Sequence, residues 1–221
     1  MKIIAHVQTD FSTKFGLPRQ SGLASSVVGK IVFEKPYRNE AAFRGLEDFS
    51  HIWVVWKFSK AEKEDWSPTV RPPLLGGNKK MGVFATRSPF RPNPIGLSCL
   101  KLEKIEYDKQ LGPVLYVSGC DMMDGTPVFD IKPYLPYADS IQNATGGFTD
   151  TLSERKLAVE ISPDLTNKIS PEKLKELIEV LSIDPRPSYI DDNTRVYGFE
   201  FCNKEVKFTV ADKTLTVIEI I

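Results

Sequence analysis

The sequence predicts a mainly β protein, with a large N-terminal barrel or folded-over sheet followed by a small α+β domain. Apolar runs in the first 145 residues are short, rich in β-branched and aromatic residues, and bounded by Gly, Pro or Asn. Long helical periodicity is absent from this region, which favours many short strands joined by turns. Beyond residue 150 the pattern changes, and the strongest helix signal of the chain appears there.

Six segments of the N-terminal region have the composition and turn boundaries of strands. They are residues 3–9, 27–33, 51–58, 82–86, 97–105 and 114–120. The segment HIWVVWKF at 51–58 is nearly continuous in apolar character, so we expect a central strand that is covered on both faces. Its first residue, His51, is expected to cap or line the strand start.

A polar, Gly-containing stretch at 140–156 is the predicted linker, which separates domains at 1–145 and 150–221. In the helix that follows, Ser170 is a suitable cap and Pro171 suits the first helical position. The apolar spacing of Leu174, Leu177, Ile178 and Leu181 predicts its buried face, and DPRP at 184–187 ends it. Strands are expected at 195–201 and in a closing hairpin over 205–221.

Composition excludes several classes of protein. Lys plus Arg and Asp plus Glu both number 29, which argues against a generic polyanion binder but allows a local basic face. No apolar run approaches the roughly 20 residues of a membrane span. The three cysteines lack a CxxC spacing and are expected to be buried in a reducing cytoplasm. Two histidines without nearby partners predict no metal site.

Positive charge gathers in one stretch of this neutral chain. Between residues 71 and 101 there are six Lys or Arg and no Asp or Glu. The loop FATRSPFRPNPIGLS at 84–98 belongs to this stretch, and its prolines restrict the backbone, so ligand binding costs it little further entropy. A cationic loop of this kind suits a phosphate or carboxylate ligand. A solvated face paired with distant carboxylates is the alternative.

Carboxylates gather in a second segment, at 119–137, where Asp121, Asp124 and Asp130 follow a predicted strand. They can accept hydrogen bonds from hydroxyl or amino groups of a ligand, although Asp124 lies in a DGTP turn and can instead bond its own turn backbone. LPRQ at 17–20 is a third stiff loop with an arginine. The glycine-rich phosphate and dinucleotide motifs are both absent.

Four long motifs together resemble the TsaA-like family and, within it, the two-domain bacterial TrmO-type tRNA methyltransferases. They are GVFATRSPFRPNPIGLS, DGTPVFDIKPYLPYADS, GLEDFSHIWVVWKF and RPPLLGGNKKMG, and DPRPSY with the closing hairpin extends the resemblance into the second domain. The resemblance implies a single-sheeted β-barrel that binds S-adenosylmethionine. It also implies a homodimer, and methylation of N6 of threonylcarbamoyladenosine at position 37 of threonine tRNA, next to the anticodon.

The resemblance also implies where the cofactor binds. The matched positions are Pro18, Arg19, Gln20, Phe58, Ser59, Lys60, Arg87, Leu97, Asp121, Met122, Met123 and Asp124. The family pattern has His-Gln where this chain has Ser59-Lys60, a change that main-chain contacts can survive.

The acceptor nitrogen is a poor nucleophile, so a group that helps it lose its proton is expected. Asp130, Tyr134 and Tyr137 are the candidates. Candidate RNA contacts are Lys79, Lys80, Arg91, Arg186, Lys204 and Lys207, with Tyr189 near Arg186. Arg186 can alternatively pair with Asp184 or Asp191 at the helix end. A non-catalytic RNA-binding module and a small-molecule methyltransferase are the competing functions.

Overall fold

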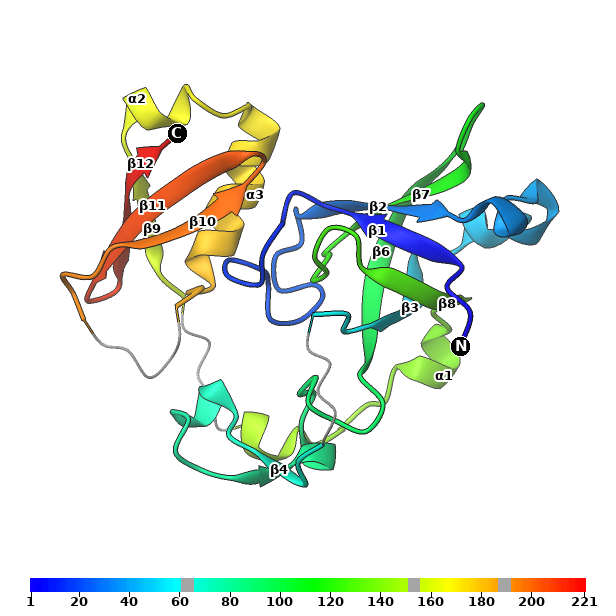
Figure 1. Ribbon diagram of the computed structural model, residues 1–221, viewed down its shortest axis with the longest axis horizontal. Coiled ribbons are helices and arrows are strands. Elements are labelled where there is room, and N and C mark those ends of the chain that lie inside the picture. The colour runs from blue at the N-terminus through cyan, green and yellow to red at the C-terminus, as the bar shows by residue number, and fades with distance from the viewer. Residues whose placement is uncertain (61–65, 151–155, 187–191) are drawn as a thin grey trace.

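The computed structural model describes residues 1–60, 66–150, 156–186 and 192–221. It contains a closed barrel, a separate four-stranded sheet and a small lobe around β4 that lies beside both (Figure 1). Within the described residues, no helix combines the length and the hydropathy needed to cross a membrane.

Six antiparallel strands close the barrel, as the fold prediction requires. In pairing order they are β1 (Ala5–Gln8), β2 (Val28–Phe33), β7 (Gly112–Ser118), β6 (Ile95–Asp108), β3 (His51–Lys57) and β8 (Pro127–Pro133). Side chains alternate between the packed interior and the outside, as the period of a strand requires. On β3, Ile52, Val54 and Trp56 are buried while Trp53 is only half-buried. The outer face of β3 is therefore less covered than its sequence predicts.

Two predictions about the barrel were wrong. Residues 82–86 are not a strand, because only Met81–Gly82 form a strand, β5, and Val83–Ala85 turn into the 3₁₀ helix η5. The strand β8 was missed, because its prolines and the preceding DGTP turn mark it as a loop. Pro127 is tolerated there as the first residue of the strand.

The lobe is built around a two-residue ladder in which β4 (Thr69–Val70) pairs with β5. Two 3₁₀ helices, η4 (Pro73–Leu75) and η5, lie on either side of β5 in the sequence. The remaining short helices are η1 (Lys35–Tyr37), η2 (Glu40–Phe43), η3 (Leu46–Asp48), α1 (Pro136–Asp139), η6 (Gly147–Thr149) and α2 (Pro163–Thr166).

The second sheet has the predicted C-terminal hairpin at its centre. Its order is β10 (Tyr197–Phe201), β11 (Lys204–Ala211), β12 (Thr214–Ile220) and β9 (Ala158–Ile161). Strand β9, which sequence analysis missed, pairs in parallel with β12. The helix α3 (Pro171–Ser182) begins as predicted, because the Ser170 hydroxyl accepts a bond from the N–H of Lys173. Its buried face includes Val180, whereas Ile178 is exposed, which corrects the predicted face.

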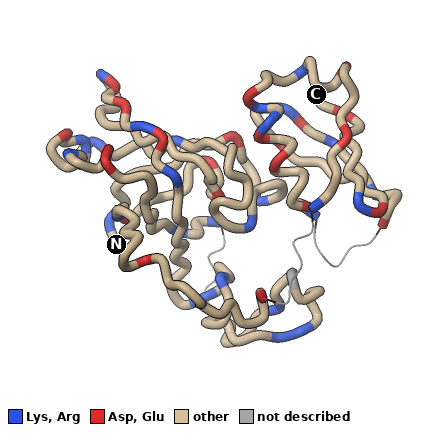
Figure 2. Tube along the Cα trace, turned by 180° about the vertical axis from the view of Figure 1, so that it is seen from behind, with Lys and Arg blue, Asp and Glu red and all other residues tan. Residues whose placement is uncertain are grey.

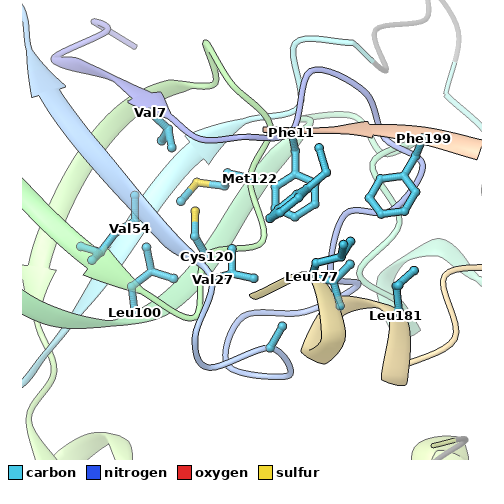
Figure 3. Close-up of a cluster of buried hydrophobic side chains, with 14 of the residues drawn as sticks. Val7, Phe11, Val27, Val54, Leu100, Cys120, Met122, Leu177, Leu181 and Phe199 are labelled. Atoms are coloured by element: carbon cyan, nitrogen blue, oxygen red, sulfur yellow. The ribbon is translucent and has the colours of Figure 1, made fainter. Parts of the chain in front are cut away.

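The loop between β1 and β2 joins the two domains into one core. Phe11 is 1% exposed and its ring centroid lies 5.3 Å from that of Phe201. Figure 3 shows Phe11 between Met122 of the barrel segment and Phe199 of the second sheet. Gly16 sits against the Phe199 ring with φ of +88°, so a side chain there would clash at 2.3 Å. A small, left-handed residue is therefore required at this junction.

Candidate functional site

A large cleft opens at one end of the barrel, with a volume of about 2880 Å³. Its walls come from the β1–β2 loop, the end of β3, the start of β6 and the segment before β8. The lobe, residues 146–149, residue 156 and residues 183–184 complete it. Three stretches singled out in the sequence, LPRQ, 84–98 and the carboxylate segment, therefore meet in one place.

The cleft is strongly cationic although the chain is neutral. Among the described residues nine Lys or Arg line it against three Asp. The cations are Lys14, Arg19, Lys57, Lys60, Arg71, Lys80, Arg87, Arg91 and Lys156, and the acids are Asp121, Asp124 and Asp184. Figure 2 shows some of these basic positions on the lobe. Not every cation of the stretch from 71 to 101 lines the cleft. Lys101 lies outside it and pairs with Glu103 at 3.0 Å.

Asp121 lies at the cleft end of a hydrogen-bond chain that begins in the core. The indole N–H of Trp56 donates to Ser98 Oγ at 2.9 Å, and that hydroxyl donates to Asp121 Oδ1 at 2.6 Å. Burial raises the pKa of Asp121 to about 6, although the Ser98 bond and the positive charge of Arg87 oppose the rise. A carboxylate held this way is a strong acceptor for a ligand donor.

Arg87 and the LPRQ loop meet across the cleft. The guanidinium of Arg87 donates to the side-chain oxygen of Gln20, and both residues line the cavity. Arg91 is turned back on its own loop, where Nη1 donates to the carbonyl of Thr86 at 3.1 Å. Arg19 reaches the second domain instead, and its Nη2 donates to the carbonyls of Asp184 and Arg186 at 3.1 and 2.7 Å.

The side chain of Asp124 accepts its hydrogen bond from outside its own turn. Its Oδ1 accepts a bond from the main-chain N–H of Thr9 at 3.1 Å, and its own N–H donates to the carbonyl of Phe11 at 2.9 Å. Asp124 thus fixes the start of the β1–β2 loop. Met123 lines the cleft, whereas the Met122 side chain is fully buried in the core, so its predicted contact with a cofactor would have to come from the main chain.

The other predicted cofactor positions also line the cleft, and they are mostly apolar. Pro18 is buried and Leu97 is 54% exposed on the wall formed by β6. Phe58 packs on Trp56 with ring centroids 4.2 Å apart, and Ser59 and Lys60 follow it along the rim. These residues add apolar surface to the cleft that also contains the Asp121 carboxylate.

The three candidate catalytic residues lie away from this cleft. Pro127 lines it, but β8 then runs away at roughly 3.3 Å per residue, which carries the chain about 20 Å further by Tyr134. Asp130 pairs with Lys132 at 3.0 Å, and the Tyr134 ring packs against Trp53. Tyr137 is 88% exposed.

The predicted RNA contacts fall into two groups. Lys80 and Arg91 line the cleft, and Lys79 is exposed on the same lobe. The others, Arg186, Lys204 and Lys207, belong to the second domain.

Their side chains are partly engaged there. Arg186 makes the alternative contact considered for it, a two-pronged ion pair with Asp184 at 2.8 and 3.0 Å. Lys207 pairs with Glu219 at 2.7 Å. Tyr189 lies outside the described residues. Ser98 was not among the predicted site residues, because nothing in the sequence marks a small polar residue within a strand as a partner of Asp121.

The closed barrel carries at its end a cationic cleft that contains the Asp121 carboxylate. This architecture defines a barrel-type binding protein rather than a doubly wound nucleotide-binding protein. The family model described as the tRNA-methyltransferase O N-terminal domain matches residues 6–140. The model of the TrmO C-terminal domain matches residues 154–221. The chain therefore belongs to the TrmO family.

Curated proteins and solved structures agree with this membership. A tRNA (adenine(37)-N6)-methyltransferase of Escherichia coli is 38% identical over 95% of this chain and 92% of its own length. A putative S-adenosylmethionine-dependent methyltransferase of Pseudomonas aeruginosa is 40% identical over 84% of this chain and 81% of its own. The crystal structure of TrmO from Pseudomonas aeruginosa has a TM-score of 0.78 at 30% identity, covering 99% of this chain and 97% of that one.

Proposed function

We propose that the protein is an S-adenosylmethionine-dependent tRNA methyltransferase that modifies N6 of the adenine at position 37, next to the anticodon. The observation that carries the proposal is the cleft, in which nine Lys or Arg of the described residues surround the half-buried Asp121 carboxylate in a neutral chain. Such a cleft suits both a small zwitterionic cofactor and a polyanionic substrate. The names of its family and of its relatives support the same reaction.

The side chains of the cleft fit the cofactor by their chemistry. Asp121 and Asp124 are acceptors for amino and hydroxyl groups, and Arg87 is a donor for a carboxylate. Leu97 and Phe58 supply apolar surface suited to a flat heterocycle. When bound, S-adenosylmethionine supplies a methyl group activated by a positive sulfur.

The cationic rim provides the means to hold the anticodon loop. Arg71, Lys80 and Arg87 face the same cavity as Asp121, so phosphate contacts at the rim would direct an extruded base toward the floor. Transfer then depends on bringing acceptor nitrogen and methyl carbon to about 3–3.5 Å, which is a task of positioning. We propose that the specific substrate is threonylcarbamoyladenosine in threonine tRNA. We also propose that the protein acts in the cytoplasm.

We also propose that the protein forms a homodimer. Asp130, Tyr134 and Tyr137 lie on the barrel away from the cleft of their own chain, and Tyr137 is largely exposed. A second copy gives these side chains access to a cleft that they do not reach within one chain. Sedimentation measurements test the oligomeric state. Mixing a Tyr137→Ala chain with an Arg87→Ala chain tests the sharing, because a shared site regains activity in the mixed dimer.

Mass spectrometry of nucleosides from threonine tRNA tests the reaction. Incubation with enzyme and S-adenosylmethionine is expected to add one methyl group to threonylcarbamoyladenosine and to leave tRNA lacking that modification unchanged. Binding of RNA without calorimetric uptake of S-adenosylmethionine would instead identify a non-catalytic RNA-binding module. Methylation of a small acceptor with no tRNA present would identify the second alternative.

A further inference from the structure

Two aromatic rings stack on the surface of the lobe without being buried by it. The ring centroids of Trp66 and Phe84 are 6.1 Å apart, and their planes differ by 30°. Trp66 is 49% exposed and Phe84 is 72% exposed. Large rings are usually the main contributors to cores and interfaces, so a stacked pair left in solvent indicates a binding surface.

The backbone of the lobe holds this pair in place. Thr69 pairs with Gly82 and Val70 with Met81, and the N–H of Val83 donates to the carbonyl of Pro68 at 2.9 Å. Val83 is 1% exposed, so the turn at η5 points this residue inward and the neighbouring Phe84 outward. A pair positioned before binding loses little entropy when a ligand arrives.

The charged residues near Trp66 and Phe84 indicate which kind of ligand the two rings bind. Arg71 follows β4, and Lys79 and Lys80 precede β5, in the stretch from 71 to 101 that contains no acid. Phe84, Arg71 and Lys80 all line the cleft. Aromatic faces beside cations suit the bases and phosphates of single-stranded nucleic acid. Two rings fall far short of the roughly 800 Å² that each partner buries in a stable protein interface, and like charges around them would oppose a second copy.

We propose that Trp66 and Phe84 form a stacking platform for an unpaired base of the anticodon loop that neighbours the methylated adenine. The platform holds that neighbour at the rim while Arg71 and Lys80 contact the adjoining phosphates, so that the target base is presented to the floor of the cleft. This inference rests on the proposed tRNA methyltransferase function.

Binding of an anticodon stem-loop RNA to Phe84→Ala and Phe84→Tyr tests the platform. Loss of one stacking surface is expected to weaken binding roughly 5- to 100-fold, whereas tyrosine retains the ring and near-normal affinity. The salt dependence of binding should stay unchanged, because no phosphate contact is lost. Tyr107→Ala is the matched control, since Tyr107 is 50% exposed near the end of β6, outside the cleft.

Tryptophan fluorescence gives a second, direct readout. Trp56 is 7% exposed and Trp53 is half-buried, so Trp66 is the tryptophan best placed to stack on a base. The stem-loop should quench the emission of the unmodified chain, and Trp66→Phe should remove that quenching. An abasic nucleotide beside the target adenine should remove it as well.

Four outcomes would overturn the platform, the last of them kinetic. In the first, Phe84→Ala binds the stem-loop as tightly as the unmodified chain. In the second, quenching persists in Trp66→Phe. In the third, Phe84→Ala changes the oligomeric state, which makes the pair a contact between copies. The proposed function is judged separately: if the unmodified chain neither binds nor methylates tRNA, the function fails, whereas normal methylation by Phe84→Ala with unchanged KM for tRNA rejects the platform alone.

Discussion

Asp121 carries a charge in a place where burial disfavours it. Its pKa is raised to about 6, so the folded protein binds a proton more tightly than the unfolded chain, in which an aspartate has a pKa near 3.9. Between those values the free energy of unfolding falls as pH rises, and above about pH 6 the full cost is present. The site therefore keeps a destabilising carboxylate for its chemistry, as functional sites often do.

Asp121→Asn is expected to make the protein more stable at pH 7.5. Asn retains an acceptor for the Ser98 hydroxyl and removes the buried charge, so the free energy of unfolding should rise by up to about 3 kcal/mol. Thermal denaturation measures this, and the gain should largely vanish at pH 4. The same variant should bind S-adenosylmethionine more weakly. An Asn variant that melts lower at pH 7.5 would show that the carboxylate is stabilised by more than the bonds seen here.

Arg87→Ala tests the arginine that faces Gln20 across the cleft. If Arg87 pairs with the carboxylate of the cofactor, loss of this charge-assisted bond should cost about 1.5–3 kcal/mol, which is roughly ten- to a hundredfold in affinity. Calorimetric titration with S-adenosylmethionine measures the change. Arg44→Ala, at an exposed arginine after η2, is the control and should bind normally. Unchanged affinity in folded Arg87→Ala removes Arg87 from the cofactor site.

At the scale of elements, the sequence predicted strands best where alternation is clear and turns are far away. Six barrel strands exist, but only five were predicted, because Pro127, Pro133 and the DGTP turn obscure β8. The apolar run GVFAT looked like a strand, yet its apolar side chains serve different purposes: Val83 anchors the lobe and Phe84 is presented to solvent. Composition cannot distinguish these uses, because both need the same residue types.

Helix α3 supports the cleft as well as its own domain. Glu179 accepts bonds from the Ser25 hydroxyl at 3.0 Å, from the Ser26 N–H at 2.6 Å and from the Ser26 hydroxyl. Burial opposes the charge of Glu179, but these hydrogen bonds outweigh it and lower its pKa. Ser25 and Ser26 end the loop that contains LPRQ. The second domain therefore positions one wall of the cleft, in addition to the RNA contacts predicted for it from the sequence.

Glu179→Gln is expected to lower stability at pH 7 by about 1–2 kcal/mol, because Gln is a weaker acceptor for the Ser25 and Ser26 donors. A lowered carboxylate pKa contributes stability above its unfolded value of about 4.3, and this contribution is lost as pH falls. The difference from the unmodified chain should therefore shrink below pH 4. Urea denaturation at pH 7 and pH 3.5 measures both values. Lys175→Gln, at an exposed position of the same helix, is the control.

At the scale of the whole molecule, one core runs through both domains, and little in the local sequence pattern indicates it. Phe11 and Phe15 lie in a loop whose length and Pro and Gly content predict a surface segment. In the structure Phe11 packs on Phe201, and Phe15 packs on Tyr197 and Phe208. Contacts between residues almost 200 positions apart depend on tertiary packing, which local pattern does not encode. Eleven of the twelve cofactor positions matched from the motifs nevertheless line the cleft.

The distribution of charge over the molecule predicts which face the tRNA covers. Arg71 and Lys80 line the cleft, so Arg71→Ala and Lys80→Ala should each reduce the slope of log affinity against log salt by about one. Lys207 is already paired with Glu219, so Lys207→Ala should leave the slope unchanged. Filter binding of threonine tRNA at several salt concentrations measures these slopes.

Arg186→Ala separates the two roles considered for that residue. Its guanidinium pairs with Asp184, which is 6% exposed, so the variant leaves a buried carboxylate without its partner and should melt at a lower temperature. It should also loosen the main-chain carbonyls that hold Arg19, and so weaken cofactor binding. If the residue instead grips RNA, the salt slope falls by about one while melting and cofactor affinity hold. In that case the tRNA extends from the cleft onto the second domain.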